Sequence, residues 1–253
     1  MISLKQIETF LNTLLQPDKI KDYGPNGLQV TGNDRIEKIA LGVSANLEFF
    51  KKAVEQGCQA CLVHHGLFWK NDWPITIDPI WKGRLEFLFK HNLSLFAYHL
   101  PLDVHPEMGN NAQILKLLNC SIDQPFGYDE GTPIGFAGTL PQPTDFDDLV
   151  KKTTELTGLE GVVFPFGKKK VSTIATVVGG GSYAVKEAIA KGYDVFLTGN
   201  LNEHNQEVIR EGGINVIAPG HYVSEQFGVK AVGEMIREKL GVGVEFLKVS
   251  NIL

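Results

Sequence analysis

Short apolar runs alternate along this chain with stretches in which apolar positions recur every three or four residues. This alternation is typical of an α/β protein, in which buried strands and amphipathic helices follow one another. Residues 1–7 begin an amphipathic helix. Residues 39–43 and 60–63 are apolar runs separated by a helix-period stretch, and residues 93–98 form a third run. The pattern predicts strands connected by helices.

The same pattern occurs again 135 residues later. Residues 39–62 and 174–197 align without a gap, and seven of the 24 aligned positions are identical, including Gly57 with Gly192. Each segment has the order strand, turn, helix, strand, which is that of a βαβ unit in a parallel sheet. The two glycines fall where a helix C-cap favours a residue that tolerates positive φ. Residues 214–220 then repeat the apolar run 93–98, and a histidine follows each.

We therefore predict an α/β fold of two linked, related lobes with mainly parallel sheets flanked by helices. The first lobe is expected over residues 1–126, completed by the C-terminal segment 220–253, and the second over 127–219. The turn-rich stretch 127–143 is expected to join them. Sites in parallel α/β sheets form beyond the carboxyl ends of the strands. The prediction is therefore a site in the cleft between the lobes.

Composition narrows the classes of function. The 253 residues are 43% hydrophobic and 21% charged, as in an ordinary globular protein. The net charge of −5 makes a nucleic-acid partner unexpected. The one basic run is Lys168–Lys170, and its simplest interpretation is a solvated turn. No apolar stretch approaches the roughly 18 residues of a membrane helix. We therefore expect no association with a membrane. Three cysteines make no disulfide framework, so a reducing cytoplasm is the expected location.

Histidines follow three of the predicted strands, and two of them have a carboxylate four residues later. Imidazole nitrogens and carboxylate oxygens are ligands for zinc, iron, manganese and cobalt. The clusters hold more ligands than one ion needs, which predicts a site for two divalent metal ions. They are the pair His64 and His65, His99 with Asp103, and His221 with Glu225.

Each cluster also has a plainer interpretation. Successive side chains of a strand point to opposite faces, so His64 and His65 both ligate only where the strand ends, and Gly66 permits the backbone to turn there. A capping role for Asp103 at the helix expected from residue 110 is the alternative to ligation, although the spacing makes Asn110 or Asn111 the better cap. The residues at 221 and 225 share one face if the segment is helical, but a surface pair at a helix start has the same spacing.

Two other motifs are weaker candidates. Cys58 and Cys61 have Cys-x-x-Cys spacing, but the repeat pairs them with Tyr193 and Phe196, which favours packing over metal binding or redox chemistry. The loop Gly179-Gly180-Gly181 lies between a strand and a helix, where backbone N–H groups can hold phosphate, yet it lacks full dinucleotide-binding spacing. A tight strand–helix turn is its default interpretation, with substrate contact as the alternative.

The combination of motifs closely resembles the YbgI-type dinuclear-metal family, the type 2 homologues of GTP cyclohydrolase I. The likeness runs through nearly the whole chain in matching order. The motifs on which the likeness rests are Asn26-Gly-Leu-Gln-Val, Val63-His-His-Gly-Leu-Phe-Trp69, Ala97-Tyr-His-Leu-Pro-Leu-Asp103 with Gly109-Asn-Asn111, Leu197-Thr-Gly199 and Gly220-His-Tyr-Val-Ser-Glu225.

The resemblance implies two α/β lobes, a dinuclear metal centre in the cleft and a homohexameric ring. Only 67 residues separate Asp103 from Val171, so the chain matches the compact form without an inserted domain. After Thr-Gly this chain has Asn200 and His204 in place of the usual histidine-rich or acidic positions, which leaves the role of that loop open. By the resemblance, His99 lies beside the site, and the metal ligands are His64, His65, Asp103, His221 and Glu225.

Five ligands for two ions leave coordination positions for water and substrate, as in a catalytic site. We therefore expect a metal-dependent hydrolase acting on a nucleotide or a related small molecule, with His99 as the proton shuttle. The family name suggests hydrolytic opening of the guanine ring of GTP. The alternative is a metal-stabilised, ring-shaped scaffold or binding protein without turnover.

Overall fold

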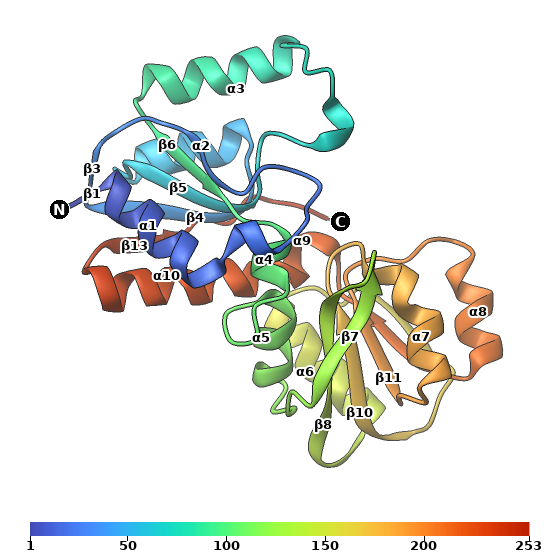
Figure 1. Ribbon diagram of the computed structural model, residues 1–253. Coiled ribbons are helices and arrows are strands. Elements are labelled where there is room, and N and C mark those ends of the chain that lie inside the picture. Colours follow the sequence, from blue (N-terminus) through green and yellow to red (C-terminus); the bar gives the residue numbers. More distant parts are fainter. Residues whose placement is uncertain (253) are drawn as a thin grey trace. The chain divides into compact units, whose positions relative to one another are not determined.

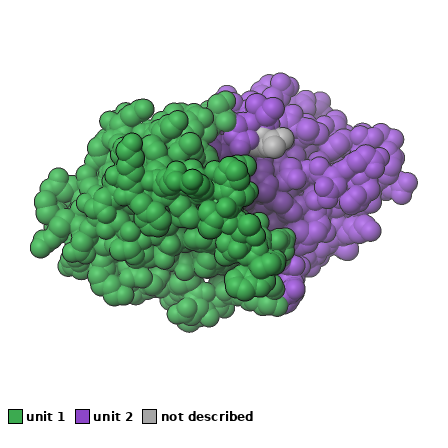
Figure 2. Space-filling model, turned by 90° about the horizontal axis from the view of Figure 1, so that it is seen from above, with its two compact units in different colours: residues 1–102, 229–250 green, residues 103–228, 251–253 purple. Residues whose placement is uncertain are grey.

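The chain folds into two compact units, each built around one sheet. The computed structural model describes residues 1–252 (Figure 1). Unit 1 comprises residues 1–102 and 229–250, and unit 2 comprises residues 103–228 with the C-terminal end from Asn251 (Figure 2). These limits differ from the predicted lobe boundaries at residues 126 and 219. The reason is that the helix and hairpin over residues 110–145 pack with unit 2.

Unit 1 contains a five-stranded mixed sheet in the order β13-β4-β5-β6-β2. The first four strands are parallel to their neighbours, and β2 is antiparallel to β6. A separate pair, β1 with β3, is antiparallel. The strands are β1 (Ile2–Ser3), β2 (Gly27–Val30), β3 (Arg35–Ile36), β4 (Lys38–Ser44), β5 (Ala60–His65), β6 (Ser94–Ala97) and β13 (Gly243–Phe246).

Helices cover both faces of this sheet (Figure 1). Gly42 faces the Phe49 ring of α2, whereas Leu41 faces Gly233 of α10, so neighbouring residues of β4 pack against opposite layers. The N-terminal helix α1 forms as predicted, and Ser3 and Gln6 close a capping box at its start. The helices are α1 (Leu4–Leu15), α2 (Leu47–Glu55), α3 (Pro79–Lys90), α4 (Leu100–Asp103) and α10 (Gln226–Leu240), with short 3-10 turns η1 (Pro17–Lys19) and η2 (Lys70–Asp72).

Unit 2 contains a six-stranded mixed sheet in the order β7-β8-β10-β11-β12-β9. Only β10, β11 and β12 are parallel to one another, so the expectation of mainly parallel sheets is wrong for this unit. The strands are β7 (Gln124–Asp129), β8 (Thr132–Asp145), β9 (Val162–Pro165), β10 (Lys170–Val177), β11 (Val195–Thr198) and β12 (Asn215–Ala218). The helices are α5 (Asn110–Leu117), α6 (Phe146–Thr157), α7 (Val185–Ala190), α8 (Asn205–Gly212) and α9 (His221–Ser224), with the 3-10 turn η3 (Gly181–Ala184).

The sequence suggested that the stretch 127–143 connects the two lobes, but the structure shows that it does not. It lies in the β7–β8 hairpin, whose long second strand pairs with β10. Two of its glycines have local structural roles. Gly131 adopts φ +85 at the hairpin turn, and a side chain at Gly135 would overlap the carbonyl of Thr176 on the neighbouring strand.

The predicted internal repeat is present in the structure. In unit 1, Ile39 of β4 pairs with Ala60 of β5, and in unit 2 the residues 135 positions later, Ile174 and Val195, pair in the same parallel register. Both helices of the repeat end as expected, with Gly57 at φ +70 and Gly192 at φ +73. In both units the third parallel strand leads to a histidine, and the predicted sites lie at these carboxyl ends. None of the helices in residues 1–252 combines the length and apolar character needed to cross a lipid bilayer.

Candidate metal centre

Two histidines form the carboxyl end of β5 in unit 1. His64 is completely buried, whereas His65 is partly exposed. Their ring centroids are 4.7 Å apart. The ring of His99, just beyond β6, lies 5.0 Å from that of His64 and 5.6 Å from that of His65. One nitrogen from each of the three rings lies within 4.8 Å of the other two. The predicted convergence of His64, His65 and His99 in unit 1 is therefore present.

Hydrogen bonds fix the orientation of the paired imidazoles. The Nδ1 of His64 lies 3.0 Å from the carbonyl oxygen of Tyr98. A carbonyl only accepts, so Nδ1 carries the hydrogen and Nε2 carries the lone pair that a metal requires. The Nδ1 of His65 lies 3.1 Å from the hydroxyl of Ser44, its partner residue on β4. Metal-binding histidines are commonly held in this way through the second ring nitrogen.

Gly66 gives the histidine pair space rather than an unusual backbone angle. The turn predicted there needs no positive φ, because Gly66 is not in the left-handed region. A side chain at Gly66 would overlap the amide of Gln29. That amide donates from Nε2 to the carbonyl of Pro25 and accepts from the backbone N–H of Leu67. A larger residue after the pair would therefore have to displace the Gln29 amide from these hydrogen bonds.

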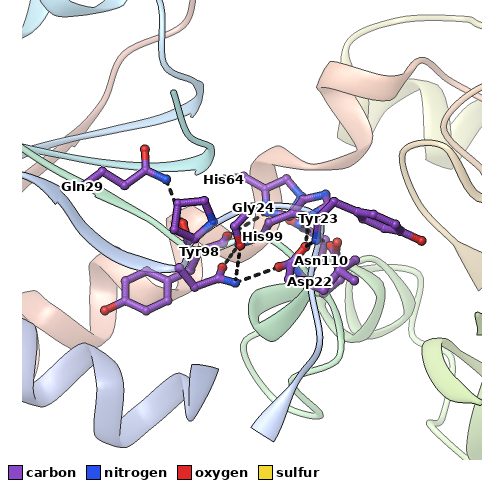
Figure 3. A network of polar contacts seen from close by, with 12 residues as sticks. Asp22, Tyr23, Gly24, Gln29, His64, Tyr98, His99 and Asn110 are labelled. Carbon is purple, nitrogen blue, oxygen red and sulfur yellow. Dashed lines mark hydrogen bonds and ion pairs between the residues drawn. The ribbon is translucent and has the colours of Figure 1, made fainter. Parts of the chain in front are cut away.

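His99 forms a partly buried polar pair with Asp22 (Figure 3). Its Nδ1 lies 2.7 Å from Oδ1 of Asp22, whose side chain is 3% exposed. The same carboxylate accepts hydrogen bonds from the Asn26 amide and the backbone N–H of Leu100. Burial alone raises the pKa of Asp22, but the hydrogen bond and charge of His99, with help from Asn26, lower it further than burial raises it. The net effect is a lowered pKa, so Asp22 stays ionised and holds the His99 ring in one orientation.

In unit 2, His221 and Glu225 form the predicted pair on one face. His221 begins α9, and its Nε2 lies 3.1 Å from Oε2 of Glu225. The Nδ1 of His221 lies 3.2 Å from Oδ1 of Asn200, at the end of β11. If Nδ1–H donates to this oxygen, Nε2 of a neutral ring directs a lone pair at a carboxylate oxygen. Such an arrangement requires a proton or a cation between the two atoms, so these donors suit a metal ion.

Gly179 lets the pair approach the strand–helix loop. It adopts φ +58, and a side chain there would overlap Oε1 of Glu225 and lie 3.1 Å from Nε2 of His221. Its N–H donates to the hydroxyl of Ser224. Gly180 has an ordinary φ of −75 and more open surroundings. The glycine loop that the sequence left unassigned therefore makes room for the two candidate ligands.

Asp103 is held by a neighbouring amide and does not cap α5. Its Oδ1 accepts a 2.9 Å hydrogen bond from Asn110, whose own oxygen accepts from the N–H of Gly228. The residue at the N-cap of α5 is Gly109, so the expected cap at Asn110 or Asn111 is wrong. Both amides are buried and have other partners. Asn111 accepts from the N–H of Val178 and donates to the carbonyl of Ile134.

The cysteines pack in the apolar cores, as the repeat suggested. Cys58 and Cys61 belong to the core cluster between β5 and α2, and Cys120 to the core of unit 2. All three are free thiols. Burial raises the pKa of Cys58 to about 11 and that of Cys120 to about 12, and it raises the pKa of Cys61 strongly. Thiols with raised pKa values are poor ligands and poor nucleophiles.

The structure adds orienting roles that sequence reasoning missed. They lie in irregular segments or at element ends, where apolar periodicity gives no signal. Each acts by orienting a candidate residue. They are Asp22 beside His99, Ser44 beside His65, Asn110 beside Asp103, and Gly179 beside Glu225.

Comparison with known proteins places this chain in a family. The Duf34/NIF3 (NGG1p interacting factor 3) model matches residues 2–252. The chain belongs to this family. Relatives in this family align with the full length of this chain and show no inserted domain. A "GTP cyclohydrolase 1 type 2 homolog" of Archaeoglobus fulgidus is 39% identical over 252 residues, covering 100% of both chains, and a relative of the same name from Pyrococcus horikoshii is 38% identical, covering 95% of this chain and 94% of its own.

Solved structures give the same result for the fold of this Duf34/NIF3 protein. A structure described as "protein ybgI, unknown function" has a TM-score of 0.93 and 33% identity, with 100% of both chains covered. TTHA1606 from Thermus thermophilus has a TM-score of 0.88 and 32% identity, again with 100% of both chains covered. The resemblance predicted from the motifs is thus confirmed, whereas the names of the relatives leave catalysis open.

Proposed function

We propose that this Duf34/NIF3 protein is a metal-dependent hydrolase that holds two divalent ions and acts on a nucleotide or a related small molecule. The observation that carries the proposal is the pair of His221 and Glu225, whose Nε2 and Oε2 lie 3.1 Å apart, close enough for both to contact one cation. The proposed ligands of the two ions are the five residues of the sequence prediction: His64, His65, Asp103, His221 and Glu225.

The chemistry of these donors suits zinc, iron, manganese or cobalt. All are nitrogen or oxygen ligands, and the thiols belong to the apolar cores. Five ligands shared by two ions leave positions for water and substrate. When bound, the ions would lower the pKa of water and stabilise the negative charge that develops as it attacks carbon or phosphorus.

His99 is the proposed proton shuttle. Its Nδ1–H donates to the ionised Asp22, so Nε2 is the atom that takes up or releases a proton. Trp69 packs edge-on against the ring at 5.1 Å, and Tyr23 lies at 6.3 Å. These contacts and the Asp22 pair hold the ring beside His64 and His65. An imidazole held this way can transfer a proton through Nε2 without a change in ring orientation.

The substrate class is proposed from the names of the relatives. They are called homologues of a GTP cyclohydrolase, which suggests a purine nucleotide and hydrolytic opening of its imidazole ring. We also propose, from the family resemblance, that the subunits assemble as a homohexameric ring. Light scattering tests the assembly, with a mass of six times the 27.9 kDa chain as the expected result.

Metal analysis combined with activity assays tests the proposal. We expect close to two metal ions per chain, and a strong loss of both ions and activity in His65→Ala and Glu225→Ala. The matched controls are His91→Ala and Glu211→Ala, exposed residues outside the candidate site, which should keep their metal. GTP, other nucleotides and phosphoesters are the substrates to screen. Full metal content in either ligand variant would overturn the assignment. Assembly that depends on metal, without any turnover, would favour the scaffold over the hydrolase.

A further inference from the structure

Unit 2 has a pocket of about 460 Å³ at the carboxyl ends of β11 and β12. Its lining includes Gly199 and the turn from Ala218 to Gly220. The apolar part of the lining includes Leu159, Val162 and Phe164. The segment after β11 contributes the polar part of the lining, with Asn200, Asn202 and Glu203 from the loop and Gln206 from α8. A volume of this size accommodates a nucleoside.

The pocket adjoins a proposed metal ligand. Gly220 lines it and immediately precedes His221. Asn200 also lines it, and its Oδ1 lies 3.2 Å from Nδ1 of His221. A molecule seated in the pocket would therefore contact the residues that orient His221. This neighbourhood connects ligand binding with the proposed reaction site.

The lining chemistry selects the kind of ligand. Phe164 and the aliphatic side chains offer a surface on which a flat ring can pack. The amides of Asn200, Asn202 and Gln206 both donate and accept hydrogen bonds. Among the lining residues that the structure describes, Glu203 carries the one formal charge, and Lys, Arg and His are absent. The pocket thus suits an uncharged ring with N–H donors, and any phosphate of the ligand would have to lie outside it.

We propose that this pocket binds the purine base of a nucleoside and that Glu203 selects guanine. A carboxylate accepts two hydrogen bonds from neighbouring donors, and guanine presents N1–H and the N2 amino group side by side. Hypoxanthine presents only N1–H, and adenine has no ring N–H on that edge. The amides can then donate to O6 and N7 of guanine. The inference builds on the proposed function, for which it names the part of the substrate that is recognised.

Calorimetric titration of the full chain with nucleosides tests this pocket. Guanosine, inosine and adenosine are compared on chelator-treated protein, so that binding is measured without metal and without turnover. We expect guanosine to bind most tightly and adenosine most weakly. Replacing Glu203 by Gln should weaken guanosine binding roughly 10- to 100-fold, because one charge-assisted hydrogen bond is lost and one donor faces an amide N–H₂. Adenosine binding should hardly change.

Glu211→Gln is the matched control, since Glu211 is equally exposed on the same segment but does not line the pocket. It should bind guanosine as the wild type does. Equal affinities for the three nucleosides, no binding at millimolar concentration, or an unchanged affinity in Glu203→Gln would each overturn the inference. Guanosine binding without any hydrolytic turnover would instead support the pocket and contradict the proposed hydrolase. Hydrolysis with unchanged KM in Glu203→Gln would support the proposed hydrolase and contradict the role of the pocket.

Discussion

At the scale of single residues, the candidate ligands depend on neighbours that have no ligand chemistry of their own. Gly179 is the clearest case, because its left-handed backbone and lack of a side chain leave the space that Glu225 occupies. Asn110 has the same relation to Asp103 through a hydrogen bond. Substitutions at such positions should alter metal binding without removing a ligand.

We expect Gly179→Ala to lose metal affinity. The new methyl group would displace the Glu225 carboxylate, and φ +58 costs a non-glycine residue about 1–2 kcal/mol. The metal content and the urea concentration at the unfolding midpoint should both decrease in this variant. Gly180→Ala is the control, since its φ is ordinary and the nearest atom to the added carbon is 3.9 Å away. Equal metal content in the two variants would show that the space at Gly179 is not needed.

His99→Gln should separate proton transfer from metal binding. The proposed shuttle supplies general acid–base catalysis, so kcat is expected to decrease by about 10²–10³-fold while metal content stays at the wild-type value. Asp22→Asn should have a smaller effect in the same direction, because it removes the ionised partner that fixes the ring. Measuring bound metal alongside the pH–rate profile distinguishes the roles. Loss of metal in His99→Gln would make His99 a ligand instead.

At the scale of elements, periodicity predicted the strands and helices of the repeat well. The parallel register of β4 with β5 recurs in β10 with β11, and an equivalent polar contact recurs beside it. Gln59 accepts from the N–H groups of residues 37 and 38, and Asp194, 135 positions later, accepts from those of residues 172 and 173. The two acceptors differ in charge, because Gln59 is a neutral amide and Asp194 a carboxylate that also pairs with Lys168.

The hairpin β7–β8 was missed because its glycines and prolines are also typical of a linker. What makes it a strand pair is the long pairing of β8 with β10, a tertiary contact that local sequence does not encode. The cap of α5 was missed for a related reason. Asn110 and Asn111 are common N-cap residues, but here their amides are used for contacts with Gly228 and Val178, far along the chain.

Asp194→Asn should destabilise unit 2 in a pH-dependent manner. Burial raises the pKa of Asp194, but Lys168 and the N–H groups of Ser172 and Thr173 lower it further, so the net pKa is lowered. The ionised form therefore stabilises the fold above the unfolded pKa of about 3.9, and this contribution is lost as the pH falls through the folded pKa. We expect a loss of about 1–2 kcal/mol at pH 7 that shrinks towards pH 3. Urea unfolding at both pH values measures it, with the exposed Asp34→Asn as control.

At the scale of the whole molecule, sequence placed the candidate residues at strand ends but not their orientation. His64 and His65 were found because two adjacent imidazoles are conspicuous, and His221 with Glu225 because their spacing matches one helical turn. The orienting bonds come from Tyr98, Asn200 and Asp22, which are distant in sequence or lie in irregular segments. Local patterns carry no information on such pairings.

The proposal that both units supply ligands to the same ions predicts that the stability of each unit depends on metal. His65 belongs to one unit and Glu225 to the other. A ligand at 100 times its Kd stabilises a protein by about 2.7 kcal/mol, which for a chain of this size is roughly 5–10 °C in Tm. Chelation should therefore lower the Tm of the wild type by about this amount. It should have little effect on His65→Ala or Glu225→Ala, because neither retains the ions.

The double variant distinguishes one shared site from two separate ones. If both residues hold the same pair of ions, the first substitution already removes the metal contribution, and the second adds almost none of it. Comparing the chelator-induced Tm shift in the wild type, the two single variants and the double variant isolates that contribution from local packing effects. Independent sites in the two units would give a different result. Each single variant would then keep half of the chelator-induced Tm shift, and the double variant would lose all of it.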